Sequence, residues 1–447
     1  MNIPDKYKGK YFFHFTHINN IDEIIRHGLL STNEKTKKRI RHLDVASKDI
    51  QCTRREMKVS CGNGGVVHDY VPFYFCPRTP MFLSIIKSRN YDQQYFVHFA
   101  LSIDKLKMES FIFTDKAANR EFEPPNFFNS PADLDKLNWD EIDNKSWRSK
   151  SDGLKHQKMA EALHHGHLST NQIDYIVVWN DFYGKKVRAL FEKHGKQCPP
   201  IFYDGKNRYY HYYCDLNSNN SESLVCGPII TKETFEGIVK NVIKERKNVR
   251  DAYLFDDIES CLNSVRANFS CIQELENITN LRTDNVVHKD NVENHTKNVI
   301  NALLESDEYD GLSDGEKLVV ELAAYLHDIG KGPKSRWRDG VQRVDDDHPR
   351  KSAIYLERFL IEDIDTISNN EIRQLILIVM YHDFIGDHII SGRKISELKG
   401  ILQSESDLKL LYTLCKADVM AIHAPWYNNR VAEWLTFYKE AKGYLND

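Results

Sequence analysis

The chain has 447 residues, a formal net charge of -4, 41% hydrophobic residues and 28% charged residues. This length is too great for one ordinary core, so we expect two or three domains. No apolar run of about 18 residues occurs, and the N-terminal segment has no apolar signal region, which argues against a membrane span or a secretory signal. With this charge, only local basic patches would contact nucleic acid. Nine scattered cysteines without CxxC spacing indicate free thiols, so we expect a cytoplasmic protein.

The first part of the chain begins with a strand and a helix. Residues 11–15 are aromatic and predict a strand, and residues 18–30 carry apolar side chains at the spacing of a short amphipathic helix. Asn19 or Asn20 suits the N-cap of this helix, and Gly28 suits its C-terminal end.

Residues 62–81 form the most distinctive stretch of this part and read GNGGVVHDYVPFYFCPRTPM. The glycines allow a close backbone approach, and residues 70–75 predict a strand with Pro72 at its start or at an edge. A rigid turn and an apolar stretch that opens at Met81 follow. Taken alone, the pattern fits a glycine-rich loop that leads into a core strand.

Two polar segments precede this stretch. The corner His14-Phe15-Thr16-His17 can hold a nucleotide, although on its own it favours a structural cap. Arg54, in the charged segment 44–59, suits a pyrophosphate because a guanidinium recognises phosphate oxygens in a planar fashion. The alternative for Arg54 is a solvated helix face.

Further short strands are predicted at residues 94–101, 111–114 and 174–180, which favours a mixed, mostly antiparallel α+β domain. Between them, residues 149–165 predict a helix or turn that carries Glu161. A single glutamate on such a segment is usually exposed and inert.

The order of these segments resembles the DarT family, which comprises NAD-dependent ADP-ribosyltransferases of toxin–antitoxin systems that modify bases in single-stranded DNA. The resemblance covers about the first 210 residues and rests on HFTHINN, IQxxR, the block at residues 62–81 and MAEAL. It implies a split β-sandwich around a nicotinamide cleft, with NAD as co-substrate and a macrodomain-type antitoxin as a candidate partner. The residues that it assigns to the cofactor are His14, Thr16, Asn20, Gly28, Tyr70 and Met81.

The same resemblance makes Glu161 the catalytic acid and lets Arg54 contact the NAD phosphate or the reacting base. A carboxylate suits this role because cleavage of the bond to nicotinamide develops an oxocarbenium-like cation. One departure is the sequence PPNFF at residues 124–128, where some family members place a histidine. This departure leaves open the identity of the target base, and the choice between DNA and RNA also stays open, with DNA favoured.

Residues 216–284 read as a polar linker, at 216–224, followed by helical packing without visible chemistry. The basic run at residues 240–250 fits either a nucleic-acid contact or, more commonly, a solvated helix face.

Residues 285–447 contain a second set of candidate ligands. An apolar helix over residues 318–326 ends in His327-Asp328, and imidazole with carboxylate suits divalent first-row metals. The order of His295, His327-Asp328 and Asp418 resembles the HD phosphohydrolase superfamily, an all-α fold, and that family often places further ligands where His348 and His382 stand. The resemblance implies one or two ions of Mn, Fe, Co, Ni, Zn or Mg that produce a hydroxide for attack on phosphorus. The acidic run at residues 345–347 favours a solvated turn.

The sequence therefore predicts a DarT-like domain at residues 1–215, a helical linker region at 216–284 and an HD domain at 285–447. The predicted function is NAD-dependent ADP-ribosylation of a base in single-stranded nucleic acid, of the toxin or phage-defence type, joined to a metal-dependent phosphohydrolase. The alternative is an HD nuclease or nucleotidase as the main activity, with the first domain as a nucleic-acid reader. A third reading is a regulatory HD domain that only binds a nucleotide.

Overall fold

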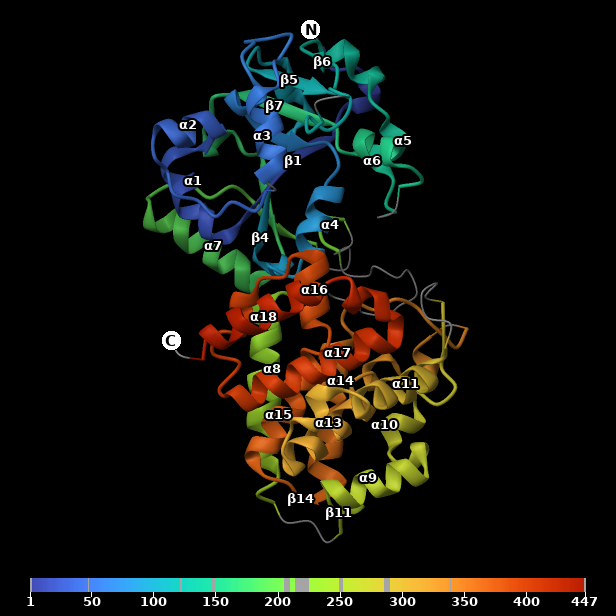
Figure 1. Ribbon diagram of the computed structural model, residues 1–447. Coiled ribbons are helices and arrows are strands. Elements are labelled where there is room, and N and C mark those ends of the chain that lie inside the picture. Colours follow the sequence, from blue (N-terminus) through green and yellow to red (C-terminus); the bar gives the residue numbers. More distant parts are fainter. Residues whose placement is uncertain are drawn as a thin grey trace. The chain divides into compact units, whose positions relative to one another are not determined.

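The computed structural model describes residues 2–46, 48–120, 123–146, 149–204, 210–213, 225–248, 252–284, 290–337 and 339–445. The chain forms two compact units (Figure 1): unit 1 comprises Met1–Lys87 and Asp92–Cys214, and unit 2 comprises Ser88–Tyr91 and Asp215–Asp447. The predicted linker at 216–224 lies outside the described residues, as do the last residues of the basic run, 249–250. Among the described residues, no helix is both long and apolar enough to cross a membrane. The cysteines that the structure describes are all free, as predicted.

Unit 1 is built on an eight-stranded sheet with the order β10-β9-β4-β1-β3-β7-β5-β6. Neighbouring strands are antiparallel except β10 and β9, so the predicted mixed, mostly antiparallel sheet is confirmed. The strands are β1 (Tyr11–His17), β3 (Tyr70–Tyr74), β4 (Phe96–Ser102), β5 (Phe111–Thr114), β6 (Phe127–Phe128), β7 (Glu161–His165), β9 (Tyr175–Val178) and β10 (Ile201–Tyr203). A separate small pair joins β2 (Leu29–Leu30) to β8 (His167–Leu168).

The sheet opens between β1 and β3. Strand β1 pairs with β4 along its whole length, and β3 does so with β7, but β1 and β3 are joined at one residue pair, Phe13 opposite Tyr74. The two halves therefore diverge from this junction, which is the split sheet that the resemblance implies.

Pro72 lies in the middle of β3, so the expectation that it marks the start of this strand is wrong. It pairs with Leu163 of β7, and its carbonyl oxygen faces His14 of β1 at 2.8 Å. Because the N and O of one residue point to the same side of a strand, the missing N–H of Pro72 also faces the gap. Proline is tolerated here because no ladder bond is required on that side.

The helices of unit 1 are α1 (Ile21–His27), α2 (Thr32–Lys37), α3 (Lys48–Glu56), α4 (Pro80–Lys87), α5 (Trp139–Asp143), α6 (Asp152–Lys158) and α7 (Asp181–Lys193). Figure 1 shows α1, α2 and α7 on one flank of the sheet and α5 with α6 on the other. The predicted helix or turn around Glu161 is wrong: α6 ends at Lys158, and Glu161 is the first residue of β7. Both faces of β7 are buried, so its sequence shows no alternation that would identify a strand.

Gly28 ends α1 as predicted, with φ +77°. A Cβ at Gly28 would lie 2.4 Å from His167 Nε2 and 2.6 Å from the Leu168 carbonyl oxygen. The absence of a side chain therefore lets α1 approach β8.

We expect Gly28→Ala to lower the free energy of unfolding by about 1–3 kcal/mol through backbone strain, and by a similar amount through overlap with β8. Gly9→Ala is the matched control, because Gly9 has φ +81° but no heavy atom within 4 Å of a built Cβ. Urea denaturation of both variants measures the difference, and equal losses would contradict the close approach.

Unit 2 is helical, as predicted for this region. Its helices are α8 (Pro228–Glu245), α9 (Ile258–Ala267), α10 (Gln273–Glu276), α11 (Val292–Leu304), α12 (Asp307–Asp310), α13 (Asp314–Leu326), α14 (His348–Glu362), α15 (Asn369–Met380), α16 (Phe384–Ser391), α17 (Glu405–Asn428) and α18 (Val431–Gly443). Two short parallel pairs join β11 (Phe255–Asp257) to β14 (Ile364–Thr366) and β12 (Arg282–Thr283) to β13 (Val341–Gln342).

The apolar residues of unit 2 form one contiguous core. In α15 every residue from Ile372 to Met380 is buried, so this helix is central, and α8, α13, α14 and α17 pack against it. Helix α8, which the sequence assigns to the linker region, is therefore part of the same core. The loops at the ends of α13 and α15 carry three of the candidate metal ligands, His327, Asp328 and His382.

Candidate active site and metal centre

Glu161 forms a bidentate ion pair with Arg54 of α3. Arg54 Nη1 donates to Glu161 Oε1 at 2.8 Å, and Nη2 donates to Oε2 at 2.9 Å. The side chain of Glu161 is 1% exposed and that of Arg54 is 9% exposed. Burial alone would lower the pKa of Arg54, but the adjacent carboxylate raises it, so the guanidinium stays charged. Arg54 thus lies on the buried side of α3, and the alternative of a solvated face does not hold for it.

Backbone groups fix the Glu161 carboxylate further. The Ala118 N–H donates to Oε1 at 2.9 Å, and the Ala118 carbonyl accepts from Arg54 Nη1 at 3.2 Å. The Glu161 N–H donates to the Thr114 hydroxyl at 3.1 Å. The carboxylate is consequently held in one orientation, which a group that stabilises a developing cation requires.

His14 crosses the opening between β1 and β3. Burial lowers its pKa to about 4, so the ring is neutral near pH 7. Its Nδ1 lies 2.8 Å from the Pro72 carbonyl oxygen, which can only accept, so Nδ1 carries the proton and Nε2 is left as an acceptor.

The other cofactor candidates on the β1 side form a small polar network. Asn20 Nδ2 donates to Thr16 Oγ1 and to the Leu43 carbonyl, each at 3.0 Å, and Asn20 Oδ1 accepts from the Leu43 N–H at 2.7 Å. Asn20 thereby fixes the hydroxyl of Thr16 and the segment around Leu43. Gly28 lies at the far end of α1 and contributes through the close approach described above.

Tyr70 and Met81 have different surroundings. Tyr70 is 1% exposed, and its hydroxyl donates to the Gly64 carbonyl at 2.8 Å, so it anchors the glycine-rich loop. Met81 Sδ accepts from the hydroxyl of Tyr74 at 3.1 Å. Sequence reasoning missed Tyr74, which stands opposite Glu161 in the β3–β7 register. Only the register identifies this neighbour, since an aromatic run gives no sign of which residue faces which.

Acid should weaken unit 1 through its buried histidines. Burial lowers the pKa to about 4 for His14, His17, His68 and His164. In the unfolded chain the histidine pKa returns to about 6.5. Between about pH 6.5 and pH 4 the unfolded chain therefore binds protons that the folded chain does not. We expect the stability of unit 1 to fall as the pH drops from about 6.5 to about 4. Hydrogen exchange of β1 and β7 peptides across this range measures the effect, and constant protection would contradict it.

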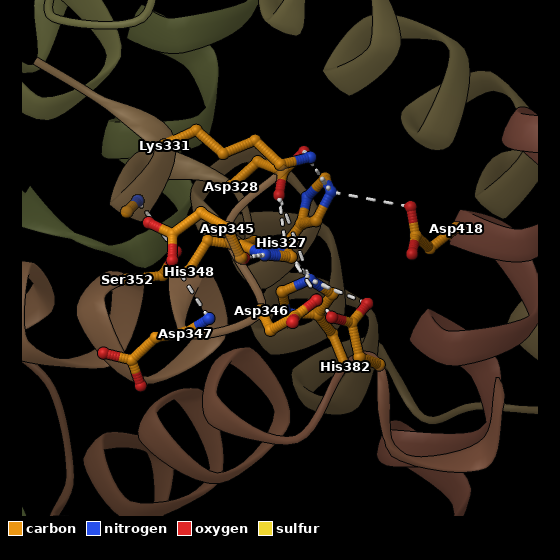
Figure 2. A network of polar contacts seen from close by, with 12 residues as sticks. His327, Asp328, Lys331, Asp345, Asp346, Asp347, His348, Ser352, His382 and Asp418 are labelled. Atoms are coloured by element: carbon orange, nitrogen blue, oxygen red, sulfur yellow. Dashed lines mark hydrogen bonds and ion pairs between the residues drawn. The ribbon is translucent and has the colours of Figure 1, made fainter. Parts of the chain in front are cut away.

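Unit 2 brings together all six predicted metal ligands. His295 lies on α11, His327 and Asp328 follow α13, His348 is the first residue of α14, His382 follows α15 and Asp418 lies on α17. Each of the six side chains is buried or nearly so. Figure 2 labels five of them and shows their side chains in one network of polar contacts: His327, Asp328, His348, His382 and Asp418.

Asp328 stands between two pairs of histidines. Its Oδ2 lies 3.4 Å from His295 Nε2 and 3.3 Å from His327 Nε2. Its Oδ1 lies 3.2 Å from His348 Nε2 and 3.9 Å from His382 Nε2. This arrangement fits two ions that share the Asp328 carboxylate.

The imidazoles are oriented for metal binding. The Nδ1 atoms of His327, His348 and His382 lie 2.8, 2.7 and 2.8 Å from the carbonyl oxygens of Ala324, Asp345 and Val379. Each Nδ1 therefore donates a proton, which leaves Nε2 free to ligate, as outer-shell carbonyls do at metal sites.

Three buried atoms of the cluster support this fit. Among the residues that the structure describes, His327 Nε2, Asp328 Oδ1 and Asp418 Oδ1 form no conventional hydrogen bond, although the two carboxylate oxygens lie 3.2 and 3.0 Å from His348 Nε2 and His295 Nε2. Burial would lower the pKa of His327, but Asp328 and Asp418 raise it to about 8, so the cluster attracts positive charge. A divalent ion would supply the missing partner for these atoms, so the residues fit the metal that the sequence implies.

Gly330 allows α14 to reach the cluster. A Cβ at Gly330 would lie 2.2 Å from the His348 carbonyl oxygen and 2.4 Å from the Ser352 nitrogen. The Gly330 N–H donates to Ser352 Oγ at 2.8 Å. This close packing brings His348 next to the His327-Asp328 turn.

The acidic run at residues 345–347 is not a solvated turn, which corrects the sequence-based expectation. Asp345 and Asp347 are 2% and 3% exposed. Asp345 pairs with Arg336 and with Lys351, and Asp347 pairs with Arg350 at 2.6 Å. Arg350 and Lys351 follow the run on the first turns of α14, and Arg336 precedes it by nine residues, so these local ion pairs allow the run to be buried.

Sequence reasoning also missed Asp383. Its carboxylate oxygens lie 3.5 Å from His382 Nε2 and 3.7 Å from His348 Nε2. A cavity of about 190 Å³ opens here, and its lining includes His295, Lys331, Gln342, His348 and Asp383. Lys331 Nζ lies 2.6 Å from Asp328 Oδ2 at the edge of the cluster. The cavity therefore offers a substrate both a cation and direct access to the ligands.

Both units thus carry a site of enzymatic type, an oriented carboxylate in a split sheet and a histidine–aspartate cluster in a helical core. Residues 13–210 match the family described as "ssDNA thymidine ADP-ribosyltransferase, DarT", and residues 292–418 match the HD domain. The DNA ADP-ribosyl transferase of Thermus sp. (strain 2.9) is 30% identical over 203 residues, which cover 44% of this chain and 95% of that protein. The chain belongs to the DarT family, and its C-terminal part contains an HD domain.

A second relative agrees in kind, and one solved structure is similar in sequence. The DNA ADP-ribosyl transferase of Thermus aquaticus (strain ATCC BAA-2747 / Y51MC23) is 34% identical over 157 residues, 34% of this chain and 67% of that protein. The solved structure of Thermus sp. 2.9 DarT in complex with NAD+ is 27% identical, covers 47% of this chain and 100% of that chain, and has a TM-score of 0.39. The family assignment rests on the sequence matches.

Proposed function

We propose that unit 1 transfers ADP-ribose from NAD to a base in single-stranded DNA. The observation that carries this proposal is the position of the Glu161 carboxylate. Glu161 lies on β7, next to β3, which borders the opening of the sheet, and its carboxylate is held by Arg54 and by the N–H of Ala118. The proposed cofactor residues His14 and Thr16 lie on β1, and Asn20 and Gly28 flank the two ends of α1, on the other side of this opening.

In the proposed reaction, the N-glycosidic bond between ribose C1′ and nicotinamide breaks, and nicotinamide leaves with the bonding electrons. Glu161 stabilises the cationic ribose carbon, to which a ring nitrogen of the base then bonds. The proton of that nitrogen passes to the Glu161 carboxylate. Arg54 orients the carboxylate through its two hydrogen bonds, while Tyr70 and Met81 shape the wall of the site.

In unit 2 we propose that His295, His327, Asp328, His348, His382 and Asp418 hold divalent ions. Such ions supply Lewis acidity and a nucleophilic hydroxide for attack on phosphorus. Lys331, which lines the cavity beside Asp328, would bind a phosphoryl oxygen of the substrate.

We propose a DarT-like domain at 1–215 and an HD domain at 285–447, with the helical region 216–284 packed into the core of the latter. We also propose a cytoplasmic location and regulation by a macrodomain-type antitoxin. The free cysteines support a reducing compartment. A second candidate function makes the HD domain the main activity, with unit 1 as a nucleic-acid reader. The cavity beside the metal cluster favours hydrolysis by unit 2 in either case.

The deciding experiment incubates the full chain with labelled NAD and single-stranded DNA and RNA oligonucleotides of each base. Label on a DNA oligonucleotide, with release of nicotinamide, is the expected result. Oligonucleotide hydrolysis that needs metal, without any transfer of label, would instead favour the second candidate.

A further inference from the structure

Tyr74 is the closest cross-strand neighbour of Glu161. The two residues stand opposite each other in the antiparallel β3–β7 pair, and opposite residues present their side chains to the same face about 4.5–5.5 Å apart at Cβ. Tyr74 also stands opposite Phe13, in the residue pair that joins β1 to β3. It therefore lies where the two halves of the sheet diverge.

Tyr74 as a residue is more exposed than Glu161. The Glu161 side chain is 1% exposed, whereas Tyr74 is only half-buried. A planar group that approaches Glu161 from solvent would therefore meet the ring of Tyr74 first. One face of this ring is already stacked on Phe15, with centroids 6.1 Å apart and planes inclined by 19°.

The hydroxyl of Tyr74 is a donor with a weak partner. It donates to Met81 Sδ at 3.1 Å, and a thioether sulfur is a poor acceptor. Burial and the Glu161 charge both raise the pKa of Tyr74, so the phenol keeps its proton at neutral pH. A carbonyl oxygen of a substrate would be a better acceptor than the sulfur.

We infer that Tyr74 is a substrate-contacting residue that stacks on the target base and donates its hydroxyl to a carbonyl oxygen of that base. This inference rests on the proposed transferase function. Together, the Glu161 acceptor and the Tyr74 donor match a base edge that has a ring N–H beside a C=O. Thymine, uracil and guanine have this N–H and C=O edge, whereas adenine and cytosine lack the ring N–H, so the pair selects the first class.

The test compares Tyr74→Phe and Tyr74→Leu with the wild-type chain on oligonucleotides that each contain one reactive base. Loss of the hydroxyl should lower kcat/KM for a thymine or guanine oligonucleotide by about tenfold. Loss of the ring should lower it by about tenfold more. The KM for NAD, and the release of nicotinamide without DNA, should change less than about twofold.

Tyr175→Phe is the matched control, because Tyr175 is a half-buried tyrosine of β9 that plays no part in the proposed site. An oligonucleotide with N3-methylthymine as its one candidate base should not be labelled, since it lacks the imide N–H. Equal transfer by Tyr74→Phe and wild type, or transfer to adenine or cytosine at the thymine rate, would overturn the inference. If the wild-type chain labels no oligonucleotide at all, the proposed function fails, which is a different result.

Discussion

Glu161→Gln should abolish the transfer of ADP-ribose to DNA. The amide keeps the shape of the side chain but removes the negative charge that faces the developing ribose cation. Loss of one such electrostatic contact typically lowers kcat by about 10²–10³-fold, and loss of the proton acceptor adds to this effect. The measurement is single-turnover transfer of label from NAD to an oligonucleotide.

The same substitution leaves Arg54 buried without a counter-charge, so instability must be separated from loss of chemistry. Removing one partner of a buried pair typically costs about 3–5 kcal/mol. The double variant Arg54→Met with Glu161→Leu replaces both charges by apolar groups and should recover much of this loss. We expect this double variant to fold and still transfer nothing; activity in a folded Glu161 variant would contradict the proposed role.

Replacement of both His327 and Asp328 by Ala should remove all bound metal from unit 2. Asp328 contacts both histidine pairs, so its loss affects the two ion positions together. Wild-type protein should contain about two ions per chain, and the variant with His348→Ala and His382→Ala should retain about one. Elemental analysis of purified protein measures these ratios.

His423→Ala is the matched control for this series, because His423 is an exposed histidine of α17 outside the cluster. Chelation of the wild-type protein should lower the stability of unit 2, by about 4 kcal/mol where the metal is present at 1,000 times its Kd. Added metal should restore it. Transfer of ADP-ribose should persist in the His327/Asp328 variant if the two units work independently. Full metal content in that variant would show that the ions are held elsewhere.

The metal cluster is predictable because several of its ligands lie on, or directly after, helices that the apolar pattern identifies. His295 sits on an amphipathic helix, and His327-Asp328 directly follows the apolar end of another. The family pattern then supplied His348 and His382. Asp383 directly follows the predicted ligand His382, and nothing in the sequence shows that its carboxylate also faces the cluster.

The details of unit 1 were harder to predict because they depend on strand register and on long-range pairing. Arg54 and Glu161 are 107 residues apart, and no periodicity links a helix residue to the first residue of a distant strand. Tyr74 is identified only once β3 and β7 are aligned. The acidic run at residues 345–347 has a different reason: its cations, Arg336, Arg350 and Lys351, are close in sequence, but a local charge pattern does not reveal that the pairs are buried.

Pro72 has a consequence for how unit 1 avoids closing on itself. Strands β1 and β3 diverge from one shared residue pair and could form further backbone hydrogen bonds that close the opening, since unpaired strand edges tend to pair. Pro72 cannot donate towards β1, and its carbonyl oxygen is already engaged by His14. The backbone at Pro72 therefore keeps the two strands from pairing further, so a dinucleotide that enters the opening need not compete with strand pairing.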